Sequence, residues 1–301
     1  MTEIKLTMKD FKSDQEVRWC PGCGDYAILA AVQSFMPELG IPRENIVFIS
    51  GIGCAARFPY YMQTYGMHSI HGRAPAIATG LAVTRPDLSV WVVSGDGDAL
   101  SIGGNHLIHA LRRNVNLKIL MFNNRIYGLT KGQYSPTSGQ GKVTGSTPMG
   151  SVDYPFNPLA LALGAGATFV ARALDIDKPG LTEVLRRAAT HQGAAFVEVF
   201  QNCNIYNDGE FDYIREDKDA RTYLANGEEF AGTGIVHDES DFATAFALAQ
   251  LSWEKDGAVP LGVFRDVDRE SYDHLVADQL AKAKGDGDLQ GLVGSGDTWT
   301  V

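Results

Sequence analysis

Residues 88–130 constrain the fold of this chain more than any other stretch. They hold an apolar run, a Gly-Asp-Gly-Asp turn, a helix-like segment and a second apolar run that ends in Asn-Asn, at 88–93, 95–98, 99–113 and 117–124. A strand, a helix and a strand of these lengths predict a βαβ unit with two parallel strands. Because parallel strands end at the same edge of a sheet, we expect Asp96 and Asn124 to lie side by side, although they are 28 positions apart.

The residues at this edge are suited to hold a diphosphate through Mg²⁺. Gly95 and Gly97 lack a Cβ, so the backbone can approach phosphate oxygens closely, and the helix that follows offers free N–H groups. Asp96 and Asn124 supply the oxygen ligands that Mg²⁺ prefers, and the main-chain carbonyl of Ile126 is a candidate third ligand. The same four letters recur in the C-terminal tail without flanking strands. The tetrapeptide alone therefore indicates only a turn, and its βαβ context carries the prediction.

Most of the chain alternates between helical and strand-like patterns. Helical periodicity covers 25–36, 74–83, 157–163, 179–191, 241–254 and 269–284, and strand-like runs cover 45–50, 167–171, 194–200 and 259–264. This alternation predicts an α/β fold with a mostly parallel sheet and helices on both faces. We expect four parts: an N-terminal arm, the α/β domain, a small C-terminal extension packed on it and a flexible tail, at 1–18, 19–204, 205–284 and 285–301. A loop as long as 128–156 inside a compact domain is usually functional.

The four cysteines could meet at the same edge of the sheet. Cys20 and Cys23 form a Cys-x-x-Cys pair, whereas Cys54 and Cys203 each follow a predicted strand. Four converging thiolates can hold Zn²⁺ or a [4Fe–4S] cluster, and single cysteines can also be structural thiols. The spacing leaves these alternatives open, although a redox cluster beside a diphosphate site would have a function there. Two disulfides are not expected, because that pattern suits small secreted domains.

Composition argues against several functional classes. The net charge is −10 without a Lys/Arg cluster, which argues against nucleic acid as a partner. The charged N-terminus lacks the apolar core of a secretory signal, and no apolar run reaches the roughly 20 residues of a membrane span. We therefore expect a cytoplasmic protein without a membrane anchor. The 45% of hydrophobic residues in 301 suffices for a full core.

Several motifs together carry a family resemblance. Gly-Asp-Gly at 95–97 followed by Asn-Asn at 123–124 is similar to the thiamine diphosphate motif. The other motifs are Cys20-Pro-Gly-Cys23-Gly, Gly51-Ile-Gly-Cys54, His71-Gly-Arg73 and Tyr127-Gly-Leu-Thr-Lys131-Gly-Gln133. With these, residues 15–205 resemble the β subunit of a 2-oxoacid:ferredoxin oxidoreductase of the 2-oxoglutarate type. The resemblance implies thiamine diphosphate, Mg²⁺ and a [4Fe–4S] cluster as cofactors.

The resemblance also implies an activity and a set of site residues. The activity is the oxidative decarboxylation of a 2-oxoacid, with the acyl group passed to coenzyme A and the electrons to a ferredoxin. The implied Mg²⁺ ligands are Asp96, Asn124 and Ile126, and the implied cluster ligands are Cys20, Cys23, Cys54 and Cys203. The implied thiamine diphosphate contacts are Gly53, Cys54, His71, Gly95, Asp96, Gly97, Asp98, Asn124, Ile126, Gly128 and Leu129.

Part of a thiamine site is missing from the chain. In related enzymes a separate pyrimidine-binding domain supplies the carboxylate that engages the cofactor's aminopyrimidine ring. This chain has one α/β sheet and no second copy of it. We therefore expect an α subunit to complete the site, in a heterodimer or a dimer of heterodimers, and no turnover by this chain alone.

Four cationic or titratable side chains are candidates for the substrate. Arg73 can fork onto the 2-oxoacid carboxylate, and His71 can donate a hydrogen bond or shuttle a proton. Lys131 or Arg57 could meet a second, distal carboxylate, which would favour 2-oxoglutarate over pyruvate. Each could equally be a solvated surface residue or a helix cap. A pyruvate-type enzyme, half of a non-redox thiamine lyase and a zinc-stabilised scaffold subunit are the alternatives.

Overall fold

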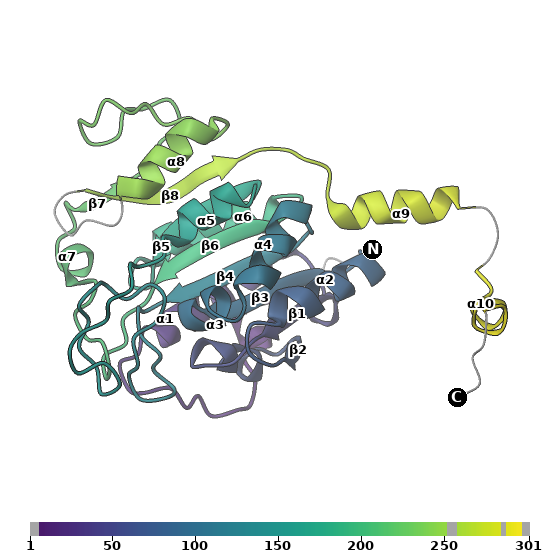
Figure 1. Cartoon of the computed structure of the whole chain (residues 1–301), viewed down its shortest axis with the longest axis horizontal. Coiled ribbons are helices and arrows are strands. Elements are labelled where there is room, and N and C mark those ends of the chain that lie inside the picture. Colours follow the sequence, from purple (N-terminus) through teal and green to yellow (C-terminus); the bar gives the residue numbers. More distant parts are fainter. Residues whose placement is uncertain (1–5, 252–257, 284–286, 297–301) are drawn as a thin grey trace.

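An eight-stranded sheet forms the centre of the molecule (Figure 1), in a computed structural model that describes residues 6–251, 258–283 and 287–296. The strand order is β2-β1-β3-β4-β6-β5-β8-β7. The strands are β1 (Ile46–Ser50), β2 (Tyr65–His68), β3 (Ser89–Gly95), β4 (Lys118–Asn123), β5 (Phe169–Leu174), β6 (Ala195–Phe200), β7 (Arg221–Tyr223) and β8 (Val259–Asp266). Strands β1 to β6 pair in parallel, and only β8 runs antiparallel to its neighbour β5. The mostly parallel sheet predicted from the sequence is confirmed.

Helices cover both faces of this sheet, as its apolar strands require. One core, on the face covered by α1 (Asp25–Phe35) and α6 (Lys178–Thr190), includes the side chains of Phe35, Trp91 and Phe122. The core on the other face is covered by α2 (Ala74–Thr84), α4 (Gly104–Arg113), α5 (Pro158–Gly164) and α8 (Phe242–Leu251). All six residues of β4 are buried, which is why its sequence reads as a continuous apolar run.

The prediction of one continuous helix at 99–113 is wrong, because the structure has two helices there. A short helix, α3 (Asp96–Leu100), begins inside the Gly-Asp-Gly-Asp motif, and α4 starts after a break at 101–103. The break lies where the loop before α2 meets it: a Cβ on Gly72 would lie only 2.4 Å from Gly103 Cα. Asp96 is thus the first residue of a helix rather than part of a preceding turn.

Two elements between β1 and α2 are absent from the sequence prediction. These are the 3-10 helix η4 (Ala55–Tyr61), which contains Pro59, and the edge strand β2. The residues of β2 are mostly exposed and carry no apolar run that would mark a strand. The other predicted elements are present, with ends shifted by a few residues, as is usual at element boundaries. The remaining short helices are η1 (Met8–Phe11), η2 (Met36–Leu39), η3 (Arg43–Asn45) and α7 (Asp212–Arg215).

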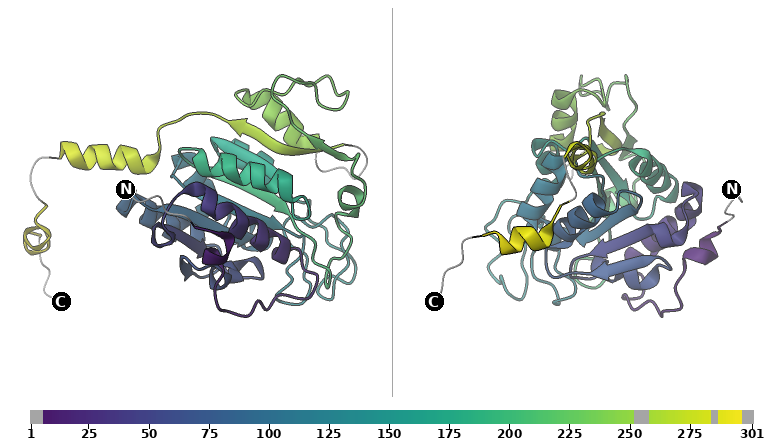
Figure 2. Two further views of the ribbon diagram at one scale, coloured as in Figure 1. Left: turned by 180° about the vertical axis from the view of Figure 1, so that it is seen from behind. Right: turned by 90° about the vertical axis from the view of Figure 1, so that its right-hand side faces the viewer.

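The two ends of the chain pack differently. In the N-terminal arm, Phe11 is fully buried in the core, so the arm is anchored to the body. The C-terminal extension adds β7 and β8 to the sheet, and α9 (Tyr272–Lys282) then begins against the body, where Asp273 accepts the N–H of Asn116 at 2.9 Å. Its far end and α10 (Leu289–Gly294) lie away from the body (Figure 2). The structure thus places a short helix inside the predicted tail. Residues 252–254 and 284 of the two predicted C-terminal helices lie outside the described residues. None of the described helices is long and apolar enough to span a membrane.

Candidate functional site

Two adjoining pockets open at the C-terminal edge of the parallel strands. The first, called here the Asp96 pocket, is lined by Ile52, Gly53, Cys54, Ala55, His71, Gly95, Asp96, Gly97, Asp98, Phe122, Asn124, Ile126, Tyr127, Gly128, Leu129 and Thr130. The second, called the cysteine pocket, is lined by Arg18, Trp19, Cys20, Cys23, Cys54, Arg57, Asn124, Gly128, Leu129, Cys203, Asn204 and Tyr206. Cys54 and Asn124 line both pockets, so a group bound in one would lie beside a group bound in the other.

The Asp96 pocket gathers the oxygen ligands that the βαβ unit predicts. Gly95 is paired with Phe122 in the sheet, so the loops after β3 and β4 start side by side. Asp96, Asn124 and Ile126 all line the pocket. Gly97 needs its missing side chain, because a Cβ there would lie 2.2 Å from the Tyr127 ring. Carboxylate, amide and carbonyl oxygens beside a helix N-terminus fit a diphosphate with Mg²⁺.

The long loop at 128–156 holds Asp96 in place. The hydroxyls of Ser135 and Thr137 each lie 2.5 Å from Asp96 Oδ2, and Oδ1 takes neither hydroxyl. All three residues are buried. Burial raises the pKa of Asp96, and the two hydroxyls partly offset that rise. Only the length of the loop pointed to a function for this segment, and no pattern in it predicts these two contacts.

Asp98 ties together three segments of the Asp96 pocket. Its carboxylate accepts hydrogen bonds from His71 Nδ1 at 2.7 Å, the Gly72 N–H at 2.9 Å, Ser94 Oγ at 2.8 Å and the Ile52 N–H at 3.3 Å. The end of β1, the loop before α2 and the end of β3 therefore converge on one buried carboxylate. With Nδ1 engaged by Asp98, the imidazole of His71 has its Nε2 left for a partner at the pocket.

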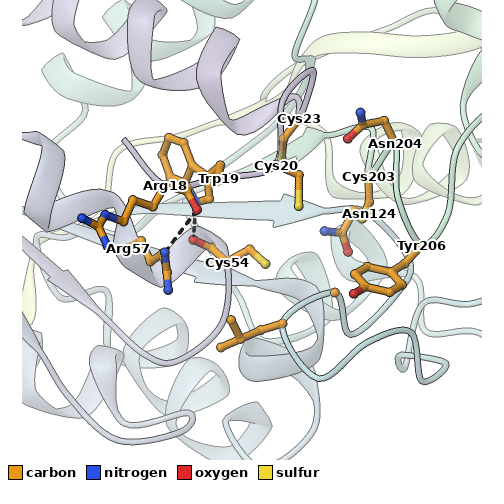
Figure 3. A pocket seen from close by; sticks show the side chains of 12 residues that line it. Arg18, Trp19, Cys20, Cys23, Cys54, Arg57, Asn124, Cys203, Asn204 and Tyr206 are labelled. Carbon is orange, nitrogen blue, oxygen red and sulfur yellow. Dashed lines mark hydrogen bonds between the residues drawn. The ribbon is translucent and has the colours of Figure 1, made fainter. Parts of the chain in front are cut away.

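The four cysteines line one pocket, as the sequence predicts (Figure 3). Cys20 and Cys23 lie in the turn before α1, Cys54 lies between β1 and η4, and Cys203 follows β6. Cys20 is exposed, Cys23 and Cys54 are partly buried and Cys203 is buried. Trp19 braces the wall by donating its indole N–H to the Cys54 carbonyl at 2.7 Å.

Burial changes the acidity of two thiols of the cysteine pocket and of the carboxyl group beside them. Burial, followed by the nearby Asp25 charge, raises the pKa of the Cys54 thiol to about 12, and the pKa of Cys23 rises for the same reasons. Burial raises the pKa of Asp25 itself to about 7. Neither oxygen of Asp25 has a hydrogen bond of good geometry to a described residue, although the Cys23 thiol partly offsets the pKa rise. The carboxyl group of Asp25 is therefore poorly compensated by the described protein groups.

The cysteine pocket has room for a group of several atoms. Its volume is about 170 Å³, enough for several water molecules. A Cβ on Gly128 would lie 3.5 Å from Cys54 Sγ and 3.6 Å from Cys203 Sγ, so Gly128 leaves this space open. Four sulfur donors at one pocket fit an iron–sulfur cluster or Zn²⁺.

The predicted cationic residues are not all brought to the pockets. His71 lines the Asp96 pocket and Arg57 the cysteine pocket, where Arg57 Nη1 donates to the Arg18 carbonyl at 3.2 Å. Arg73 lines neither pocket and donates to the His71 carbonyl at 2.9 Å. Lys131 is exposed, has a left-handed φ of 76° and also lines neither pocket.

Known proteins resemble the chain along nearly its whole length. A family model described as "Thiamine pyrophosphate enzyme, C-terminal TPP binding domain" matches residues 51–199. The 2-oxoglutarate oxidoreductase subunit KorB of Mycobacterium tuberculosis is 60% identical over 97% of this chain and 88% of its own. Subunit beta of the 2-oxoacid:ferredoxin oxidoreductase 2 of Aeropyrum pernix is 39% identical over 88% of this chain and 85% of its own.

A solved structure has the same fold throughout. It is the 2-oxoglutarate:ferredoxin oxidoreductase from Magnetococcus marinus with 2-oxoglutarate, coenzyme A and succinyl-CoA bound. The TM-score is 0.86 at 38% sequence identity, covering 99% of this chain and 98% of that chain. The resemblance thus includes the C-terminal extension as well as the two pockets.

Proposed function

This chain belongs to the family of β subunits of 2-oxoacid:ferredoxin oxidoreductases, and we propose that its reaction is the coenzyme A-dependent oxidative decarboxylation of 2-oxoglutarate. The similar KorB chain is named for 2-oxoglutarate, and the similar solved structure holds 2-oxoglutarate, coenzyme A and succinyl-CoA. The observation that carries the proposal is the adjacency of the two pockets through Cys54 and Asn124. It supports a redox thiamine enzyme over a non-redox lyase or a scaffold subunit.

The residues of the Asp96 pocket would hold the diphosphate end of thiamine diphosphate. Asp96, Asn124 and the Ile126 carbonyl would ligate Mg²⁺, and the N-terminus of α3 would face phosphate oxygens. Thiamine diphosphate supplies the electron sink for loss of CO₂, and a [4Fe–4S] cluster held by the four cysteines supplies one-electron transfer. The remaining contacts proposed for the cofactor are Gly53, Cys54, His71, Gly95, Gly97, Asp98, Gly128 and Leu129.

The cationic residues would have different tasks. His71, oriented by Asp98, would hold or move a proton at Nε2 beside the Asp96 pocket. Arg73 would act from the rim by fixing the His71 loop, or would turn to a substrate carboxylate. Arg57 and Lys131 would serve a distal carboxylate only once a partner closes the site, since neither lines the Asp96 pocket.

The partner would be an α subunit with the pyrimidine-binding domain. The name of each similar chain as a subunit supports such a partner. We infer a heterodimer or a dimer of heterodimers, with coenzyme A as acyl acceptor, a ferredoxin as electron acceptor and the cytoplasm, where thiols stay reduced, as the compartment.

The test uses the enzyme assembled with its α subunit, with reduction of a viologen dye as the readout. Asp96→Asn removes an anionic oxygen ligand, so thiamine diphosphate affinity should fall about 100-fold while iron content stays unchanged. Asp286→Asn, in the second Gly-Asp-Gly-Asp sequence, is the matched control and should leave both unchanged. Unaltered thiamine diphosphate affinity in Asp96→Asn, or dye reduction without 2-oxoglutarate and coenzyme A, would contradict the proposal.

A further inference from the structure

One buried carboxamide bridges the two pockets. Gln201, the residue after β6, is 1% exposed. Its Oε1 accepts a hydrogen bond from Asn124 Nδ2 at 2.9 Å, and its Nε2 donates to Cys23 Sγ at 3.2 Å. The Nε2 group also donates to the Asn202 carbonyl at 2.6 Å. A single side chain thus contacts one residue of each pocket, at the two ends of its amide.

The hydrogen bonds determine which way each amide points. The Asn202 carbonyl can only accept, so the end of Gln201 that meets it must be the nitrogen. Gln201 Oε1 must then face Asn124, and because Oε1 only accepts, Asn124 must present Nδ2 to it. The oxygen of Asn124 is therefore directed away from Gln201, and it accepts the N–H of Ile126 at 3.2 Å.

The backbone around Gln201 fixes its position from both sides. Its N–H donates to the Asn123 carbonyl at 3.0 Å, which ties it to the end of β4. On the other side, a Cβ on Gly24 would lie 3.0 Å from Gln201 Cγ, so the glycine after the Cys-x-x-Cys pair packs directly on this side chain. The turn that holds Cys20 and Cys23 therefore rests on Gln201.

We propose that Gln201 is a positioning residue that links the two cofactor sites, holding the Asn124 oxygen ready for Mg²⁺ and donating a hydrogen bond to the cluster ligand Cys23. The inference rests on the proposed function, because both sites must hold their metals. Groups that orient a ligand affect metal affinity, and hydrogen bonds to sulfur affect cluster potential. A donor near sulfur favours the more negative, reduced cluster, so losing it shifts the potential downward.

Two substitutions distinguish the effect of the contact with Asn124 from the effect of the contact with Cys23. Gln201→Met keeps the length of the side chain but loses all three of its hydrogen bonds. We expect the Mg²⁺ affinity, measured at fixed thiamine diphosphate, to fall about 10-fold. The midpoint potential of the cluster should be more negative than that of the wild type. Gln201→Glu keeps an oxygen for Asn124, and because the Asn202 carbonyl can only accept, the other oxygen must carry a proton and donate to it, which leaves Cys23 without a donor. Its potential should shift in the same direction, with Mg²⁺ affinity close to that of the wild type.

A buried glutamine that lines neither pocket provides the control. Gln33 is 5% exposed and donates to the Tyr61 carbonyl at 2.9 Å, and it lines neither pocket. Gln33→Met should lower thermal stability while leaving the potential and Mg²⁺ affinity unchanged. All variants are assembled with the α subunit and measured by potentiometric titration and by Mg²⁺ titration at fixed thiamine diphosphate.

The outcomes distinguish this inference from the proposed function. Wild-type potential and Mg²⁺ affinity in an iron-containing Gln201→Met enzyme would overturn the inference alone. A wild-type enzyme without iron would overturn the inference and the proposed function together. If Gln201→Met fails to assemble, Gln201→Glu decides, because an unshifted potential in that variant overturns the link to the cluster.

Discussion

The Asp96 pocket and the cysteine pocket differ in how far the protein completes them by itself. In the Asp96 pocket the carboxylates of Asp96 and Asp98 already have two and four hydrogen-bond donors. Beside the cysteine pocket, neither oxygen of the buried Asp25 has a hydrogen bond of good geometry to a described residue, and burial raises the pKa values of the Cys23 and Cys54 thiols. The protein thus holds the carboxylates of the first pocket in place by itself, whereas the groups at the second are less well compensated.

The largest expected effect comes from removing a cysteine that belongs to one pocket only. Cys20 is exposed, so Cys20→Ser should disturb the fold little. We expect loss of the cluster and a fall in dye reduction of more than about 100-fold, since a ligand matters at least as much as the groups that orient it. Thiamine diphosphate affinity should stay within about three-fold of wild type. Full iron content in Cys20→Ser would show that Cys20 is not needed to hold the cluster, against the proposal of four cysteine ligands.

The next effect is a pH dependence of stability in the metal-free chain. Because the folded pKa of Asp25 is raised from 3.8 to about 7, the folded chain keeps a proton that the unfolded chain has released between those values. The free energy of unfolding should therefore fall as pH rises through this window, by up to about 4 kcal/mol. Asp25→Asn should remove this fall, as measured by urea unfolding at pH 5 and pH 8. If the free energy of unfolding changed with pH in the same way in both proteins, the raised pKa of Asp25 would be contradicted.

A smaller effect tests the preorganisation of the Asp96 pocket. Thr137→Val keeps the shape of the side chain and removes one hydroxyl from Asp96 Oδ2. We expect the Mg²⁺ affinity, measured at fixed thiamine diphosphate, to fall about 10-fold, with the iron content unchanged. Thr84→Val is the control, because its hydroxyl meets only carbonyls of α2. Unchanged Mg²⁺ affinity in Thr137→Val would break the contrast between the pockets.

The smallest effect concerns the space between the sulfurs. Gly128→Ala places a methyl group at ordinary contact distance from Cys54 Sγ and Cys203 Sγ, so the surrounding protein tolerates it. The added methyl group would crowd a cluster in that space and weaken its binding by about 1 kcal/mol. The iron content should therefore fall partially. Gly139→Ala, with nothing within 4 Å of the added carbon, should retain full iron. Full occupancy in Gly128→Ala would place the metal elsewhere in the pocket.

The sequence predicts the meeting of distant residues where a simple rule of topology applies. Parallel strands end at one edge, and that rule places Asp96 beside Asn124 and brings Cys54 and Cys203 to the Cys-x-x-Cys turn. It also predicts the mostly parallel sheet, since buried strands read as apolar runs.

The contacts that tune the site follow no such rule. Ser135 and Thr137 lie in a loop without periodicity, and their contact with Asp96 depends on how that loop folds back. Asp25 begins a helix and would pass for an ordinary exposed first-turn acid. Gln201 is visible at a strand end, but its partner Asn124 lies 77 positions away. Polar contacts of this kind are set by tertiary packing.

The metal content of the anaerobically purified chain tests the central claim most directly. Iron, acid-labile sulfide and zinc are measured, with a visible spectrum before and after dithionite. The account predicts about four irons and four sulfides per chain and a broad visible band that bleaches on reduction. Zinc in place of iron, or four free thiols with no metal under strict anaerobiosis, would contradict it and leave the chain as part of a non-redox thiamine enzyme.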